Sequence, residues 1–359
     1  MRLVVCGGGT GGHLLPALAI LQEIRERTLV DVLWLITQRG EEQYLPLEYR
    51  NVATMPLSRF SLRPRYIRDM WRSLLFCIKK LKEFRPEVCL TCGGYASIPG
   101  VVASWWLGIP IVLCEVNVEP GKAAQFVSFF ATKIFVAYPE SISFFPFRKK
   151  ILFTGVPIRK EIFSSDRVRA SEYFHLDPNS VHLLITGGSQ GSEALNEGAL
   201  LLAREFRKQW KYPVEILHQV GSGANLEEIR AQWNGLHLRA VVQPFFTEMA
   251  LALACADIAL ARAGASTVAE LMYRGVPTVF IPYPYARKHQ VKNAEYWEKI
   301  GSARLVYQKN SWHISCGEIL TQWINHPEIR KEVARKSLTY SHPEARRKIA
   351  EFLRQYERN

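Results

Sequence analysis

Residues 261–290 combine a glycine turn, a short helix and polar side chains in an order that suits an anionic ligand. An apolar strand is predicted to end at the start of this segment, and a helix is predicted over residues 266–274. Unpaired backbone N–H groups and the positive end of the helix dipole meet at such a helix start, which favours a phosphate group. Glu270 lies one turn into the helix, where its carboxylate could accept hydrogen bonds from paired ribose hydroxyls, and His289 and Gln290 follow in a loop. We therefore predict that this segment holds a nucleotide-sugar.

A second glycine-rich loop, GGSQGS at residues 187–192, follows an apolar strand predicted over residues 181–186. A tight structural turn would by itself explain the glycines. Ser189 and Gln190 add side-chain hydrogen-bond donors that a bare turn does not need. We therefore expect this loop and the helix start behind it to bind an anionic group as well.

A third glycine-rich loop, GGGTGGH at residues 7–13, follows the N-terminal strand and matches the G-x-G-x-x-G fingerprint of dinucleotide-binding proteins. That fingerprint needs an acidic residue at the end of the second strand, which here ends in ITQR, so a nicotinamide enzyme is disfavoured. His13 closes the loop, and an imidazole with a pKa of roughly 6.5 could take a proton from a hydroxyl group near neutral pH. The alternative is that His13 only caps the helix or holds the loop.

The chain has no Asp-x-Asp pair and no cluster of His, Cys and Asp at ligand spacing, so we predict neither a metal site nor a cofactor. If a nucleotide diphosphate leaves during the reaction, other positive groups must stabilise it. We expect the helix starts near residues 189–192 and 266–267 to do so, with Arg159 nearby.

Size and charge narrow the class of protein. A chain of 359 residues, 48% of them hydrophobic, is long enough for two folded domains. Its 46 basic and 33 acidic side chains give a formal charge of +13. Such a charge favours a phosphate-rich partner: nucleic acid, an anionic membrane surface or a phosphorylated ligand.

Cysteine usage and the longest apolar run both indicate an ordinary folded chain in a reducing compartment. The seven cysteines are scattered, and we expect no targeting peptide before the first strand. Cys89 and Cys92 have CxxC spacing, but without a second pair we interpret them as buried small side chains rather than a redox or metal site. Proline and glycine interrupt residues 98–114, which we predict to be a short helix and a strand rather than a membrane span.

Strands and helices alternate along the whole chain, which predicts an α/β fold with parallel sheets covered on both faces. Each half begins with a strand, a glycine loop and a helix, and the pattern restarts near residues 154–159. In the first half we predict the helix from Pro16, because proline suits a first helical turn. The chain is therefore predicted to form two similar α/β domains.

Residues 66–84 form an amphipathic helical pattern, whose simplest interpretation is the core face of a surface helix. This segment and its neighbours are more aromatic than such a face needs, and lysines and arginines are interleaved with the aromatic residues. Apolar side chains ringed by cations suit an anionic membrane surface. RNA could use the same residues, but no signature of a nucleic-acid-binding fold accompanies them, so we predict no nucleic-acid partner. The predicted membrane patch comprises Phe60, Ile67, Trp71, Leu74 and Trp105.

Seven motifs follow one another over most of the chain and together resemble the bacterial peptidoglycan N-acetylglucosaminyltransferases of glycosyltransferase family 28. The motifs are GGGTGGH, GGYAS, EVN, GVPIR, GGSQGS, RAGASTVAE and PYPYARKHQ. The resemblance implies the GT-B fold, in which two Rossmann-like domains turn their parallel sheets to a central cleft. It implies an acceptor- and membrane-binding domain at residues 1–156 and a UDP-GlcNAc-binding domain at residues 157–338. Residues 339–359 would form a C-terminal helix that crosses back to the first domain.

The resemblance further implies an inverting transfer of N-acetylglucosamine from UDP-GlcNAc to the C4 hydroxyl of the muramyl sugar of lipid I (undecaprenyl-pyrophosphoryl-MurNAc-pentapeptide), giving lipid II. The implied partners are UDP-GlcNAc, lipid I, the anionic surface of the inner membrane and other cell-wall synthesis proteins. The implied location is peripheral, on the cytoplasmic face of the bacterial cell membrane. Two alternatives stay open: a UDP-N-acetylglucosamine 2-epimerase of the same architecture, and a non-catalytic membrane protein that binds a sugar nucleotide.

Single residues also receive roles from the resemblance. His13 matches the proposed base, Glu270 the ribose ligand and Gln290 a contact to the sugar, while Phe246 would lie against the uracil. The positions that match donor contacts are Thr10, Gly11, Gly12, Asn117, Arg159, Ser189, Gln190, Phe246, Ala265, Ser266, Thr267, Val268, Ala269, Glu270 and Gln290.

Three positions depart from the family pattern. Val116 stands where a glutamine is usual, Val156 stands where an asparagine is usual, and Arg287-Lys288 replaces a less basic pair. We expect the first two departures to bear on acceptor contacts and the third on affinity for the donor.

Overall fold

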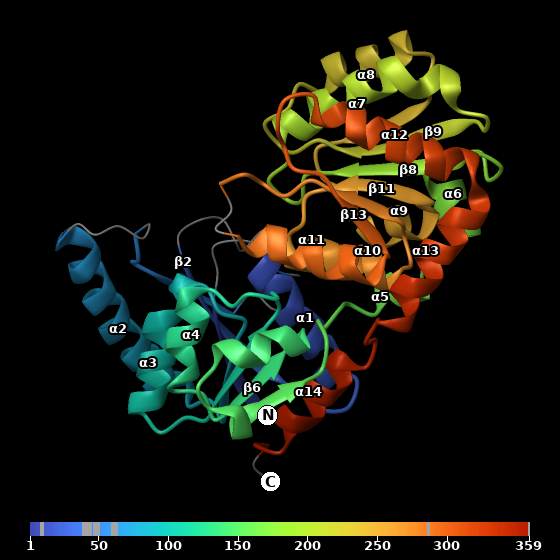
Figure 1. Ribbon diagram of the computed structural model, residues 1–359. Coiled ribbons are helices and arrows are strands. Elements are labelled where there is room, and N and C mark those ends of the chain that lie inside the picture. The colour runs from blue at the N-terminus through green and yellow to red at the C-terminus, as the bar shows by residue number, and fades with distance from the viewer. Residues whose placement is uncertain (8–10, 38–44, 46–50, 59–63, 286–287, 358–359) are drawn as a thin grey trace. The chain divides into compact units, whose positions relative to one another are not determined.

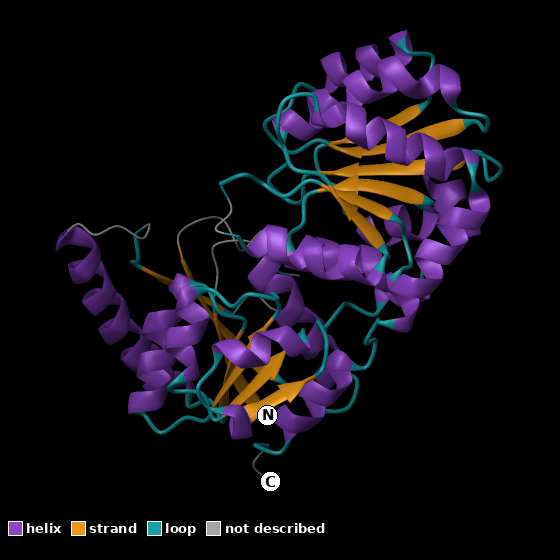
Figure 2. Ribbon diagram, viewed as in Figure 1, coloured by secondary structure: helices purple, strands orange, loops and turns teal. Residues whose placement is uncertain are grey.

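The computed structural model describes residues 1–7, 11–37, 45, 51–58, 64–285 and 288–357. The chain forms two compact units, one from Met1–Arg159 together with His342–Asn359, and the other from Lys160–Ser341. Each unit contains one parallel sheet with helices packed on it (Figure 1, Figure 2). The predicted α/β class with two Rossmann-like domains is confirmed.

The first unit has a seven-stranded sheet in the order β3-β2-β1-β4-β5-β6-β7. The chain adds strands on one side of β1 and then continues on the other side, so the order reverses between β1 and β4. The strands are β1 (Arg2–Cys6), β2 (Asp31–Thr37), β3 (Val52–Met55), β4 (Val88–Thr91), β5 (Ile111–Glu115), β6 (Lys133–Val136) and β7 (Ile151–Phe153). The helices are α1 (Gly11–Arg25), α2 (Pro64–Phe84), η3 (Tyr95–Ser97), α3 (Ile98–Trp106), α4 (Lys122–Ser128), η4 (Pro139–Phe144), η5 (Arg148–Lys150) and α14 (Ala345–Arg354).

The central strands of this sheet are continuous apolar runs because helices cover both of their faces. Every residue of β4 and β5 is buried. Cys89 and Cys92 are buried and unpaired, which confirms their interpretation as small core side chains. Residues 98–114 contain α3 and β5, as predicted, and no helix among the described residues is long and apolar enough to cross a bilayer.

The first helix starts earlier than predicted. α1 begins at Gly11 and contains Pro16 in its interior, so the prediction of a helix from Pro16 was wrong. Proline has no N–H and leaves the carbonyl four residues earlier without its helical partner, at a cost of about 3 kcal/mol. Leu14, Ala17 and Leu18 are all buried, and this packing holds the helix on both sides of the proline. The helix start therefore lies directly at the glycine loop.

The C-terminal helix α14 belongs to the first unit and packs on α1. Arg346 Nε donates to Glu23 Oε2 at 3.0 Å, and the Phe352 ring meets Phe135 edge-on at 5.4 Å. The chain thus returns to its first unit after completing the second.

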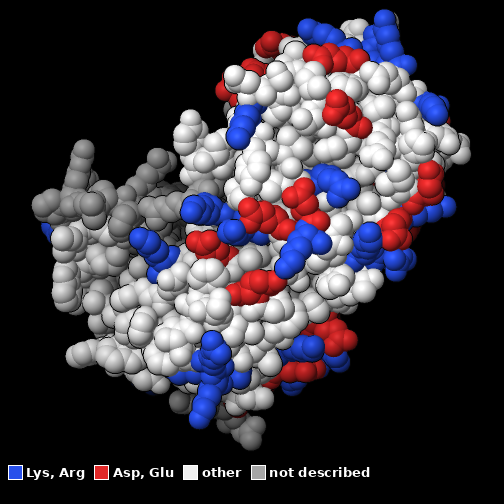
Figure 3. All heavy atoms as spheres, in the orientation of Figure 1, with Lys and Arg blue, Asp and Glu red and all other residues white. Residues whose placement is uncertain are grey.

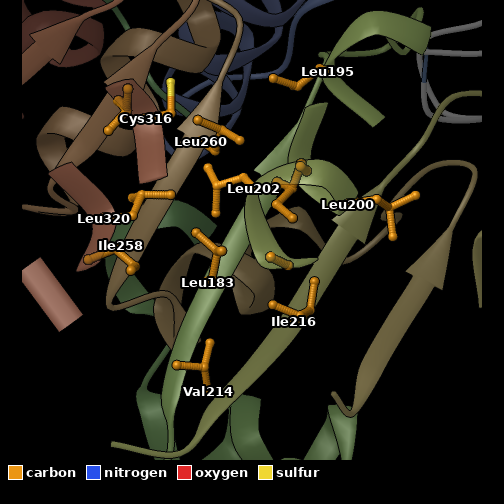
Figure 4. Packing of buried hydrophobic residues seen from close by; sticks show 14 of the residues in the cluster. Leu183, Leu195, Leu200, Leu202, Val214, Ile216, Ile258, Leu260, Cys316 and Leu320 are labelled. Carbon is orange, nitrogen blue, oxygen red and sulfur yellow. The ribbon is translucent and has the colours of Figure 1, made fainter. Parts of the chain in front are cut away.

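The second unit has a six-stranded sheet in the order β10-β9-β8-β11-β12-β13, which reverses between β8 and β11. Its core is a cluster of buried hydrophobic side chains, mostly aliphatic, from the strands and from helices that include α7 and α12 (Figure 4). The strands are β8 (Val181–Thr186), β9 (Val214–Gln219), β10 (Ala240–Gln243), β11 (Ile258–Ala261), β12 (Thr278–Phe280) and β13 (Ala303–Leu305). The helices are α5 (Glu161–Ser164), α6 (Arg167–Phe174), α7 (Glu193–Phe206), η6 (Arg207–Gln209), α8 (Leu226–Gly235), α9 (Met249–Cys255), α10 (Ala265–Tyr273), α11 (His289–Ile300), α12 (Trp312–Asn325) and α13 (Pro327–Thr339).

Candidate active site

Each sheet has one topological switch point, and the glycine-rich loops of the predicted site follow the strands beside it. In open parallel sheets, ligands bind outside the carboxyl ends of the strands where the strand order reverses. In the first unit this point lies between β1 and β4, and in the second between β8 and β11. The three glycine-rich segments follow β1, β8 and β11.

The loop after β8 has a shape that requires glycine. Gly188 and Gly191 have φ of 79° and 70°, a region that side chains disfavour. A Cβ on Gly191 would lie 2.4 Å from the carbonyl oxygen of Val220, in the loop after β9. Ser192 then caps α7 by accepting the Leu195 N–H. The loop thus brings the start of α7 to the switch point, as an anion-binding turn requires.

Ser189 and Gln190 lie at the tip of this loop. Ser189 is half-buried and Gln190 is exposed. Both side chains are therefore at the surface of the second unit, where a ligand can reach them.

Gln219, which the sequence analysis did not single out, holds two loops to the end of its own strand. Its Nε2 donates to Thr186 Oγ1 at 3.2 Å and to Gly188 O at 2.9 Å. Its Oε1 accepts the Phe246 N–H at 2.9 Å. Since Gln219 is buried, these bonds fix the loops after β8 and β10 to the end of β9.

The predicted contact between the Phe246 ring and a uracil stays a prediction, and the structure places this ring inside the second unit. Only 1% of Phe246 is exposed, and its ring meets Phe174 edge-on at 5.5 Å inside the unit. The neighbouring Phe245 is 42% exposed. Phe245 is therefore the ring of this pair that lies at the surface.

The start of α10 resembles that of α7 but lacks a side-chain cap. Gly264 is its N-cap, so no side chain accepts from the first N–H groups of the helix. The Ser266 hydroxyl oxygen is buried without a hydrogen-bond partner among the described residues. Ala265, Val268 and Ala269 have buried side chains, so a ligand at this helix start would meet the backbone rather than these groups.

Glu270 and Gln290 complete the predicted donor site. Glu270 lies in the second turn of α10 and is buried. Gln290, near the start of α11, accepts the Tyr283 N–H through Oε1 at 2.9 Å and so fastens the loop between β12 and α11. Thr267 is half-buried in the first turn of α10, and Lys288 precedes α11 with φ 45°.

In the first unit, His13 bridges the loops on either side of the switch point. His13 is the third residue of α1, and its Nδ1 lies 3.0 Å from the carbonyl oxygen of Cys92, which follows β4. A carbonyl oxygen can only accept, so the bond requires the proton on Nδ1. The lone pair of the neutral ring is therefore on Nε2, which is the state that a general base needs.

Glu115, the last residue of β5, holds Asn117 in place. Its Oε1 accepts the backbone N–H of Asn117 at 2.8 Å and the Asn117 side-chain amide at 2.9 Å. Burial raises the pKa of the Glu115 carboxyl to about 7, although these N–H donors oppose the shift. Val116 and Val156 are both buried.

The other predicted positions lie as follows. Gly11 and Gly12 open α1, and Arg159 is half-buried at the end of the first unit. Thr10, Phe60 and Arg287 lie outside the described residues. No group of three or more His, Cys, Asp or Glu side chains within the described ranges could hold a metal ion.

Arg262, Gln219 and Glu115 are site residues that the sequence analysis missed. Each is a polar side chain that ends or directly follows a buried parallel strand. Arg262 lies directly after β11 and donates to the Ser192 hydroxyl, so it joins the loops on both sides of the second switch point. A charged or amide residue at the end of an apolar run is the signal that would have found all three.

The predicted membrane patch is partly at the surface. Trp71 on α2 and Trp105 on α3 are 63% and 53% exposed, and Ile67 is also exposed. Leu74 is only partly exposed and packs against the core of the first unit, because it lies at the edge of the exposed side of α2. Leu75, Trp106, Phe126 and Phe129 are further exposed apolar side chains of α2, α3 and the end of α4. On the face drawn in Figure 3, acidic and basic side chains are interspersed.

Two family models match the chain. Residues 3–136 match the glycosyltransferase family 28 N-terminal domain, and residues 182–349 match the glycosyltransferase family 28 C-terminal domain. Two curated relatives carry the name UDP-N-acetylglucosamine--N-acetylmuramyl-(pentapeptide) pyrophosphoryl-undecaprenol N-acetylglucosamine transferase. The one from Thermodesulfovibrio yellowstonii is 32% identical over 98% of both chains. The one from Desulfitobacterium hafniense is 33% identical over 97% of both chains.

Solved structures share the fold. The crystal structure of Acinetobacter baumannii MurG superposes with a TM-score of 0.76 at 26% identity and covers 99% of both chains. A UDP-GlcNAc 2-epimerase from Neisseria meningitidis has a TM-score of 0.71 at 16% identity over 99% of this chain and 100% of its own, a likeness of fold alone.

Proposed function

The chain belongs to glycosyltransferase family 28, and we propose that it transfers N-acetylglucosamine from UDP-GlcNAc to the C4 hydroxyl of the muramyl sugar of lipid I, giving lipid II in peptidoglycan synthesis. It is a hexosyltransferase. The family models and the relatives' shared name favour this reaction over the epimerase, to which the chain has only a likeness of fold.

The observation that carries the proposal is the pair of helix starts at the carboxyl ends of β8 and β11. These strands are neighbours in the sheet, and α7 and α10 begin in the loops that follow them. Two positive dipole ends and their N–H groups suit the two phosphates of a nucleotide diphosphate. Glu270, one turn into α10, would accept from the ribose hydroxyls, and Gln290 would contact the sugar.

His13 acts as the base in the proposed reaction. The acceptor C4 oxygen forms a bond to the anomeric carbon while the bond from that carbon to the β-phosphate oxygen breaks, so the configuration inverts. The hydroxyl proton moves to His13 Nε2. This nitrogen carries the lone pair because Nδ1 donates its proton to the Cys92 carbonyl oxygen. UDP leaves as an anion toward the helix starts of α7 and α10.

Release of UDP in the presence and absence of a lipid I analogue tests the function. The proposed transferase releases UDP only when the acceptor is added, and Glu270→Ala raises the KM for UDP-GlcNAc. An epimerase would convert UDP-GlcNAc without acceptor, and a non-catalytic binder would release no UDP in either case. Either of these two results would overturn the proposal.

The exposed aromatic side chains of α2 and α3 are proposed to dock on the anionic inner surface of the bacterial cell membrane, where lipid I is held. Replacing Trp71 and Trp105 by serine is expected to weaken binding to vesicles that contain anionic lipid. Burying about 100 Å² of each indole contributes about 2.5 kcal/mol, so co-sedimentation should fall about tenfold or more.

Tyr173→Ser is the matched control, because Tyr173 is an equally exposed aromatic residue on α6 of the second unit. Its vesicle binding should equal that of the unmodified protein. If the double variant co-sediments as well as this control, α2 and α3 do not form the docking surface.

A further inference from the structure

Arg262 is a buried arginine whose hydrogen-bond donors are all engaged. It directly follows β11 and is 6% exposed. Its Nε and Nη2 donate to the Ser192 hydroxyl, at 3.1 and 2.7 Å. Nη1 donates to the carbonyl oxygens of Ile281 and Pro282, at 3.0 and 3.2 Å. Nη2 also donates to Gln308 Oε1 at 2.7 Å, so all five N–H groups of the guanidinium are used.

The positive charge of Arg262 has no acidic partner in the described part of the chain. Its acceptors are a hydroxyl, two backbone carbonyls and an amide, which are all neutral. Burial lowers the pKa of this guanidinium from its ordinary value. A buried charge without a counter-ion is costly. The Tyr283 ring, whose centroid lies 5.6 Å from the guanidinium carbon, offsets part of this cost, and a bound anion would offset more.

Arg167 lies at the opposite end of the same strands and, unlike Arg262, has an acidic partner. Its two Nη atoms donate to the two carboxylate oxygens of Asp257, at 3.1 and 3.0 Å. They also donate to the carbonyl oxygens of Cys255 and Ser180, and these partners precede β11 and β8. The second unit therefore pairs the arginine at the amino ends of the strands with an acid, but not the arginine at the carboxyl ends.

Three positive features meet at the carboxyl ends of β8 and β11. Ser192, to which Arg262 donates, is the N-cap of α7, and Gly264, two residues after Arg262, is the N-cap of α10. Two helix dipole ends and an uncompensated guanidinium thus lie around one loop. Such a concentration of positive charge selects an anionic ligand.

We propose that Arg262 is a positioning residue for the diphosphate of the bound nucleotide, to which it supplies positive charge from behind the glycine loop. The inference rests on the proposed function, because it takes UDP as the ligand. Arg262 does not need to contact the phosphates, since its N–H groups are already taken. Its charge acts through the poorly screened interior, and its bonds to Ser192 hold the start of α7 in place.

The test compares the affinities of the full chain for UDP and for uridine by calorimetry. Both ligands share the base and the ribose, so the ratio of the two affinities isolates the phosphates. Arg262→Gln should lower this ratio about thirtyfold, while the affinity for uridine changes by less than about twofold. Arg262→Lys, which retains the charge, should keep the ratio within about fivefold of the unmodified protein.

Gln308→Glu separates the charge of Arg262 from its structural role. The change is nearly isosteric, strengthens the bond from Nη2 and gives the guanidinium a counter-ion. If Arg262 had only a structural role, this variant would keep the preference of the unmodified protein for UDP over uridine. We expect the ratio to fall about tenfold at undiminished thermal stability. If Arg262→Gln does not fold, Gln308→Glu still tests the contribution of the Arg262 charge.

Arg167→Gln is the matched control, because it removes a paired arginine at the far end of the same sheet. It should lower the melting temperature and leave the ratio of affinities unchanged. An unchanged ratio in Gln308→Glu would overturn the role of Arg262 while leaving the proposed function intact. If the unmodified chain itself does not prefer UDP to uridine, the proposed function fails instead.

Discussion

His13→Ala is expected to lower kcat by about 10² to 10⁴, the usual contribution of a positioned general base. The bond from Nδ1 to the Cys92 carbonyl leaves the lone pair on Nε2, so removing the ring removes the proton acceptor. Affinity for UDP should change little, because the nucleotide is proposed to bind in the second unit. Steady-state kinetics with a lipid I analogue and calorimetry with UDP measure the two quantities separately.

His326→Ala is the control for this experiment, since His326 is an exposed histidine that pairs with Glu328. Its turnover should match that of the unmodified enzyme. The acidic limb of the pH profile of kcat/KM, which reports the base of the free enzyme, should disappear in His13→Ala. Turnover within about threefold of the unmodified enzyme would remove His13 from the role of base.

Gly191→Ala is expected to abolish tight UDP binding, while Gly188→Ala retains most of it. Both glycines have positive φ, so alanine costs about 1 to 2 kcal/mol at either position. At Gly191 the added Cβ would also lie 2.4 Å from Val220 O and 2.5 Å from Gly221 Cα, whereas at Gly188 it would meet nothing within 4 Å. The close contacts are with backbone atoms, which cannot move aside without displacing the loop after β9.

We therefore expect Gly191→Ala to lose about 2 to 5 kcal/mol of unfolding free energy and to raise the Kd for UDP about a hundredfold or more. Gly188→Ala should lose about 1 to 2 kcal/mol and keep the Kd within about fivefold. Urea unfolding and calorimetry provide both numbers. Equal losses in the two variants would show that backbone strain, rather than packing against the loop after β9, determines the shape of the glycine loop.

The buried strands of the second unit were predictable because the strands of a parallel sheet covered on both faces are short, continuous apolar runs in the sequence. β8 has the predicted bounds, Val181–Thr186. Glycine loops after such strands then indicate the ends of the sheet at which ligands bind. The fold class follows from these local patterns, whereas the family and the reaction follow from the resemblance that the ordered motifs carry, and the comparisons confirm them.

Local rules failed where packing decided the outcome. Proline favours a first helical turn, yet Pro16 lies inside α1 because buried neighbours on both sides hold the helix. Two adjacent phenylalanines look alike in the sequence, but only the structure shows that Phe246 is buried against Phe174. Leu74 is likewise an apolar residue of the kind expected at a membrane surface, but it packs against the core. The roles of the individual site residues stay predictions.

The sequence by itself determined the sheets, the glycine loops and the kind of ligand, because each depends on residues close together in the chain. The tertiary structure alone decided which polar side chains join those loops. His13 reaches a carbonyl 79 residues away, and Arg262 reaches a hydroxyl 70 residues away. Such bonds leave no periodic pattern, since they arise only when separate strands end side by side in a folded sheet.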